Sequence, residues 1–186
     1  MGVISLRRVL YRSRQFFQAL ANSLKPVSPE ERSAAWRHLP EPARPLYDAM
    51  PRADRRHSLK VMAALQAAGH DDPALLQAAL LHDCAKGEGH IRIWHRVALV
   101  LLKAFWPALP ARWAGGSMPA RTDWRYPMWA HLHHPARGAE LAAAAGCDPL
   151  AVTLIRRHQE RPAMRRGDDP SLDGLLAALQ AADDDN

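Results

Sequence analysis

The dipeptide Asp-Pro occurs three times in this sequence, each time directly before a segment rich in apolar residues: Asp72-Pro73, Asp148-Pro149 and Asp169-Pro170. An aspartate side chain accepts hydrogen bonds from the free N–H groups at a helix start, and proline, which lacks an N–H, suits the first helical position. The three dipeptides therefore predict three helix starts. Gly69 and Gly146 stand shortly before the first two and predict the ends of the preceding helices.

The rest of the chain also favours helices. Hydrophobic residues make up 48% of the 186 residues, aromatic residues make up only 6%, and runs of β-branched residues are few. A chain of this length can bury the core of one domain. We therefore expect an all-α fold, a single-domain helical bundle. Within it we assign residues 1–50 to an N-terminal amphipathic helix and a helical lead-in packed on the domain, and residues 51–186 to the main helical domain.

Further helices are expected between these starts and ends. Ser28 and Glu31 have the spacing of a capping box, which predicts a helix through Arg37. Prolines then break the chain before a short segment around residues 47–50. Apolar periodicity predicts the other helices at residues 3–24, 54–68, 93–106, 136–145 and 170–182, with loops at 110–125 and 161–169.

His82, Asp83 and Lys86 lie at the end of the segment that begins at Pro73. Adjacent residues of a helix point about 100° apart, so His82 and Asp83 can hold an ion near the helix end from two sides. Lys86 lies one turn further on, within reach of an anion on that ion. Helices joined by three or four residues are antiparallel neighbours, which brings His57 level with His82.

Other ligand-type side chains also stand at or near predicted helix ends. They are His134, His158 and an aspartate close to residue 186. We favour Asp183 because it follows two alanines in the helical register, with Asp184 as the alternative. His131 and His133 flank His134 and are alternatives to it.

These residues together resemble the HD superfamily of metal-dependent phosphohydrolases over about residues 54–185. Leu80-Leu81-His82-Asp83 followed by Lys86 is similar to the central signature of the family, and Arg56-His57-Ser58 is similar to its first histidine element. The remaining similar elements are His134-Pro135 with Gly138 and Leu141, Ile155 to Glu160, and Ala182-Asp183.

The resemblance implies a bundle of the HD-domain type, with residues 51–186 as its metal-binding helical domain. It implies a metal-dependent phosphohydrolase that cleaves a phosphate mono- or diester with metal-activated water. We interpret the substrate as a nucleotide. The implied catalytic residues are Asp83 and Lys86. Mixed imidazole and carboxylate ligands suit Mn, Fe, Zn, Co or Ni. We expect one or two such ions. Asp83 is the expected bridge between two ions. The implied metal ligands are His57, His82, Asp83, His134, His158 and Asp183.

The sequence differs in two places from the cyclic-dinucleotide phosphodiesterases of the superfamily. Gln159 stands where cyclic-dinucleotide phosphodiesterases have a second histidine, and Arg161-Pro162-Ala163 replaces the Gly-Tyr-Pro that marks cyclic-di-GMP phosphodiesterases. We therefore do not expect a cyclic-di-GMP phosphodiesterase. The substrate expected is a phosphorylated small molecule, and no specific nucleic acid partner is expected.

Two other functional classes remain open. One is a nucleotide-binding or signalling module with little turnover; the other is a membrane-surface protein that binds acidic lipids through the basic amphipathic helix at residues 3–24. The net charge of +6 fits any anionic partner and does not choose among them. Cys84 and Cys147 form no disulfide framework, and no export signal is evident, so we expect a cytoplasmic protein. The apolar run at 97–102 is shorter than the roughly 20 residues that span a membrane.

Overall fold

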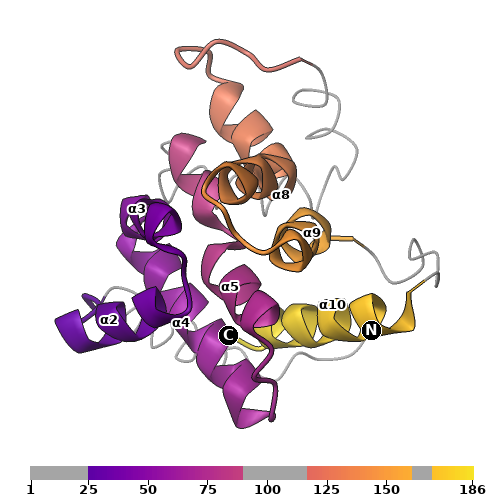
Figure 1. The fold of residues 1–186 in the computed structure, drawn as a ribbon. Coiled ribbons are helices and arrows are strands. Elements are labelled where there is room, and N and C mark those ends of the chain that lie inside the picture. The colour runs from indigo at the N-terminus through magenta and orange to yellow at the C-terminus, as the bar shows by residue number, and fades with distance from the viewer. Residues whose placement is uncertain (1–24, 90–116, 161–168) are drawn as a thin grey trace, which may run out of the picture.

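The protein was analysed as a computed structural model that describes residues 25–89, 117–160 and 169–186. In these three ranges every regular element is a helix and there is no strand, which confirms the all-α class (Figure 1). The helices expected at 3–24 and 93–106, and nearly all of the loop at 161–169, lie outside the described residues. The elements are α2 (Pro29–Arg37), η1 (Glu41–Ala43), α3 (Arg44–Ala49), α4 (Arg52–Ala67), α5 (Pro73–Leu81), η2 (Cys84–Gly89), α8 (Tyr126–Ala144), α9 (Pro149–Arg157) and α10 (Pro170–Asp184), η1 and η2 being 3₁₀ helices.

The three Asp-Pro dipeptides begin helices as predicted. The carboxylate of Asp72 accepts a hydrogen bond from the backbone N–H of Leu75 at the start of α5. The carboxylates of Asp148 and Asp169 cap α9 and α10 in the same way. Ser28 and Glu31 form the predicted capping box of α2. Gly69 and Gly146 follow α4 and α8 with φ angles of 83° and 74°, the left-handed conformation that glycine adopts most readily.

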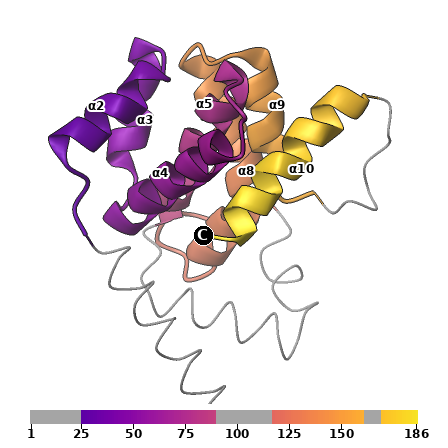
Figure 2. The same cartoon turned by 90° about the horizontal axis from the view of Figure 1, so that it is seen from below.

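Helix α5 lies at the centre of the bundle. Seven of its nine residues are buried, on all sides of the helix, so it must be enclosed by other elements. It packs against α4, α9 and α10, and Figures 1 and 2 show it between α4 and α9. The lead-in joins the same hydrophobic core through Ala35, Leu39 and Tyr47.

Helix α8 is longer than the sequence predicts. It begins at Tyr126 rather than near Ala136, and it continues through Pro135. A proline inside a helix removes the N–H that would donate to the carbonyl four residues earlier, here that of His131. Nδ1 of His134 donates to this carbonyl over 2.6 Å in its place. The side chain therefore replaces the missing backbone donor, and the helix runs on.

The nine described residues before α8, 117–125, form turns and no helix, in agreement with the expected loop. Among the helices that the structure describes, none combines the length and apolar character needed to cross a membrane.

Candidate metal centre

Three histidines of the predicted set share one local geometry. His82 and His158 are the C-terminal cap residues of α5 and α9, and His134 precedes the proline of α8. At such positions backbone carbonyls lack their usual helical donors. In each case Nδ1 donates to the carbonyl three residues earlier, which leaves Nε2 as the ring nitrogen that can bind an ion. The accepting carbonyls belong to Ala79, Ile155 and His131, at 3.0, 2.7 and 2.6 Å.

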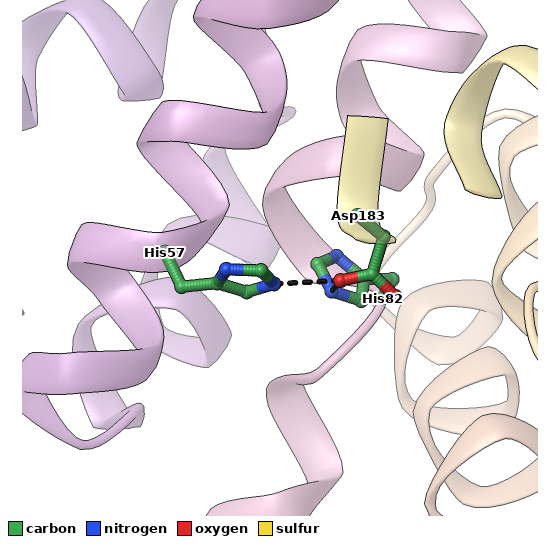
Figure 3. A group of neighbouring side chains, drawn as sticks. All are labelled: His57, His82 and Asp183. Carbon is green, nitrogen blue, oxygen red and sulfur yellow. Dashed lines mark hydrogen bonds and ion pairs between the residues drawn. The ribbon is translucent and has the colours of Figure 1, made fainter. Parts of the chain in front are cut away.

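His57, His82 and Asp183 form the first cluster, which we call the outer group (Figure 3). Nε2 of His57 lies 2.7 Å from Oδ1 of Asp183, and Nε2 of His82 lies 3.5 Å from the same oxygen. The side chains of His57 and Asp183 are 23% and 29% exposed, whereas that of His82 is fully buried. The outer group is therefore open to solvent on one side.

Asp83, His134 and His158 form the second cluster, the inner group. Oδ1 of Asp83 lies 3.3 Å from Nε2 of His134 and 3.8 Å from Nε2 of His158. The two imidazole Nε2 atoms are 3.2 Å apart. All three side chains are at most 3% exposed. The inner group is therefore enclosed by protein.

The carboxylate of Asp83 lies between the two groups. Its Oδ1 faces the inner group, and its Oδ2 is 3.5 Å from Nε2 of His82 in the outer group. Lys86 also contacts Oδ2, with Nζ at 2.5 Å. One carboxylate thus presents an oxygen to each group, which is the position that a bridging ligand requires.

The charges around the two groups favour a cation. Burial raises the pKa of Asp83, but the positive charge beside it, with Nζ of Lys86 at 2.5 Å, helps to outweigh burial, and that pKa lies well below its ordinary value. Burial would also raise the pKa of Asp183, but His57 and His82 outweigh burial and hold that pKa below its ordinary value. Both carboxylates are therefore ionised at neutral pH. Burial lowers the pKa of His158 to about 3, so this imidazole is neutral and keeps a lone pair on Nε2.

Two buried acceptor atoms show that these residues fit a metal ion. Nε2 of His82 and Oδ1 of Asp83 are inaccessible to solvent, and neither makes a hydrogen bond to a described residue. A buried polar atom without a partner costs about 1–3 kcal/mol, and a cation would satisfy both atoms. Imidazole nitrogens combined with carboxylate oxygens are a donor set typical of transition metals. The two groups could thus hold a metal ion.

The structure brings all six predicted ligand-type residues into these two groups. Asp183 belongs to the outer group, and Asp184 is exposed and belongs to neither. His131 and His133 are not part of the groups; His133 instead stacks on Trp129, with ring centroids 4.5 Å apart. Lys86, expected to face a bound anion, contacts the carboxylate of Asp83.

Three further residues contact the groups or lie beside them, and sequence analysis assigned none of them such a role. The amide nitrogen of Gln159 lies 3.4 Å from Nε2 of His134. Gln180 donates to the carbonyls of His158 and Glu160, each over 2.8 Å. Gln180 stands three residues before Asp183, so helical spacing alone could have placed it on the same helix face as that candidate ligand. Arg56, next to His57, pairs with Glu31 of the capping box; this contact spans two helices and leaves no local signal.

Comparison with known proteins gives no match: no protein-family model fits the chain, and neither the curated proteins nor the solved structures include one similar enough to count.

Proposed function

We propose that this protein is a metal-dependent phosphohydrolase of the HD type, which cleaves a phosphate mono- or diester of a nucleotide with metal-activated water. The observation that carries the proposal is the convergence of six histidine and aspartate side chains with two buried acceptor atoms that make no hydrogen bond to a described residue. Buried polar atoms without a hydrogen bond are costly, and a bound cation would satisfy both of these.

In this proposal each group holds one ion position. His57, His82 and Asp183 would hold an ion at the outer group, His134 and His158 would hold one at the inner group, and Asp83 would contact both. A divalent ion such as Mn, Fe, Zn, Co or Ni, if bound there, would lower the pKa of a water ligand toward about 7. The three imidazoles whose Nδ1 atoms are fixed by backbone carbonyls keep their Nε2 atoms in place for binding.

The open side of the outer group gives a phosphate ester access to the site. His57 and Asp183 are partly exposed there, and Lys86 is 19% exposed beside Asp83. The Lys86 ammonium orients the Asp83 carboxylate and adds positive charge next to the site. That charge offsets the negative charge that develops on the phosphoryl oxygens during attack by water.

A substrate panel tests the proposal. The purified protein would be incubated with nucleotides, cyclic nucleotides and simple phosphate mono- and diesters, with Mn, Ni, Co, Fe or Mg supplied in turn. We expect hydrolysis of at least one ester with a transition metal and its loss in Asp83→Ala, while elemental analysis shows bound metal only in the wild type. Absence of bound metal together with wild-type behaviour of Asp83→Ala would refute the proposal. Stabilisation by a nucleotide without hydrolysis would instead indicate a binding module of low turnover.

A further inference from the structure

Within the described part of the chain, three other polar atoms lie near Nε2 of His134, and only one of them carries a hydrogen. The proton of His134 itself is on Nδ1, because that nitrogen donates to the carbonyl of His131. Its Nε2 therefore holds a lone pair. Oδ1 of Asp83, at 3.3 Å, is an acceptor, and Nε2 of His158, at 3.2 Å, also holds a lone pair, since Nδ1 of His158 donates to a carbonyl.

The remaining neighbour is the side-chain amide nitrogen of Gln159, at 3.4 Å. An amide nitrogen has two hydrogens to donate, so it is the natural partner of the His134 lone pair. An ion in the inner group would need this same lone pair. The amide N–H and the ion cannot both use it.

The surroundings of Gln159 leave its side chain free to move while its backbone stays in place. Gln159 is an exposed residue, so its side chain can turn into solvent without disturbing the core. The carbonyls on either side of it, those of His158 and Glu160, are both held by Gln180 of α10. A change at the Gln159 side chain is therefore local.

We propose that Gln159 competes with a metal ion for Nε2 of His134 and thereby controls whether the inner group is filled. In the outer group an ion would displace only the contact between His57 and Asp183, which are two members of the group itself. Among the described residues no amide from outside the group competes for these atoms, so this group fills first. The inner group fills only at a higher metal concentration, after the amide has turned away. This inference rests on the proposed metal centre and states how many ions that centre holds under given conditions.

The test is a titration with Co²⁺ alone, followed by calorimetry and by elemental analysis of the bound metal. Wild type, Gln159→Leu and Gln66→Leu are compared; Gln66 is an exposed glutamine near the end of α4 and serves as the matched control. His134→Gln, which removes an inner ligand, identifies the step that belongs to the inner group. Leucine fills a similar volume and has no hydrogen to donate.

We expect two steps in the wild type, the weaker one absent from His134→Gln. Gln159→Leu should lower the dissociation constant of that weaker step about two- to tenfold, as loss of one competing hydrogen bond implies, and leave the tighter step unchanged. Gln66→Leu should match the wild type. A wild type that binds one ion while Gln159→Leu binds two supports the proposal equally.

Three results would overturn it: an inner step unchanged in Gln159→Leu, an inner step weakened in that variant, which would make the amide a ligand, or an inner step tighter than the outer one. A wild-type protein that binds no Co²⁺ is a different failure, since it refutes the metal centre and the proposed function together. The two failures are thus distinguishable in a single experiment.

Discussion

Nζ of Lys86 lies 2.5 Å from Oδ2 of Asp83, while Oδ1 of the same carboxylate lies 3.3 Å from Nε2 of His134. The Lys86 ammonium on η2 thus holds the carboxylate through Oδ2, while Oδ1 faces the imidazole of His134 on α8 without a hydrogen bond. Lys86 is three residues after Asp83, and the backbone N–H of Lys86 donates to the Asp83 carbonyl over 3.0 Å, so the short 3₁₀ turn sets this geometry locally. The orientation of Asp83, the candidate ligand between the two groups, therefore depends on Lys86, which belongs to neither group.

Replacing Lys86 with methionine separates charge from metal binding. Methionine keeps the length of the side chain and removes the ammonium. We expect Lys86→Met to retain bound transition metal but to hydrolyse the substrate about 100-fold more slowly, because the developing phosphoryl charge is no longer offset. Hydrolysis rates and metal content are measured on the same preparation. Lys60→Met, on α4, is the control and should keep full activity; equal rates in the two variants would contradict the role given to Lys86.

Two adjacent aspartates at the end of α10 provide a matched pair. Asp183 contacts His57 and His82, whereas Asp184 is exposed. Loss of residues that only support metal ligands already weakens metal binding by about 10–100-fold, so loss of a ligand should cost at least that much. We expect Asp183→Asn to raise the dissociation constant for Co²⁺ by at least about 100-fold. Asp184→Asn should bind as the wild type does, and a reversed pattern would move the ligand to Asp184.

Replacing Pro135 with alanine is expected to change stability and metal binding in opposite directions. Alanine at this position restores a backbone N–H, which competes with Nδ1 of His134 for the carbonyl of His131. Alanine is also more favourable than proline inside a helix by up to about 3 kcal/mol. We therefore expect Pro135→Ala to unfold at a higher temperature in chelator and to bind Co²⁺ about tenfold more weakly. Pro127→Ala, in the first turn of the same helix, should not weaken Co²⁺ binding; an unchanged affinity in Pro135→Ala would show that the proline does not fix the His134 ring.

The low pKa of His158 predicts how stability depends on pH. Burial lowers this pKa to about 3 in the folded protein, against about 6.5 in an unfolded chain. Below about pH 6.5 the unfolded state therefore binds a proton that the folded state does not, and the free energy of unfolding falls as the pH falls toward 3. Urea denaturation in chelator, near neutral pH and at about pH 5, should show a smaller loss of stability in His158→Gln than in the wild type. An equal loss in both proteins would argue against a buried neutral imidazole at this position.

The parts of the fold that local chemistry determines could be predicted from the sequence. Asp72, Asp148 and Asp169 cap helices because a carboxylate next to the first N–H groups acts within three residues. The closeness of His57 and His82, with ring centroids 5.4 Å apart, follows from the short connection between two helices. The convergence of six ligand-type residues agrees with the set that the family resemblance implied.

The parts that depend on distant contacts or on side-chain geometry could not be predicted. Pro135 indicates a helix boundary by its missing N–H, and only the position of the His134 ring shows that the helix continues. The pairing of Arg56 with Glu31 joins residues on two helices, and nothing in either segment points to the other. The approach of Gln159 to His134 likewise depends on how α8 and α9 pack.

Gln180 and Asp183 stand on the same helix and reach different groups. Gln180 holds the end of α9, where His158 of the inner group lies, and Asp183 contacts His57 and His82 of the outer group. Because both residues belong to α10, a displacement of this helix along its axis would displace both contacts together. If ions bind as proposed, an ion that draws Asp183 inward would also displace the support of His158, and α10 would mechanically couple the two proposed ion positions.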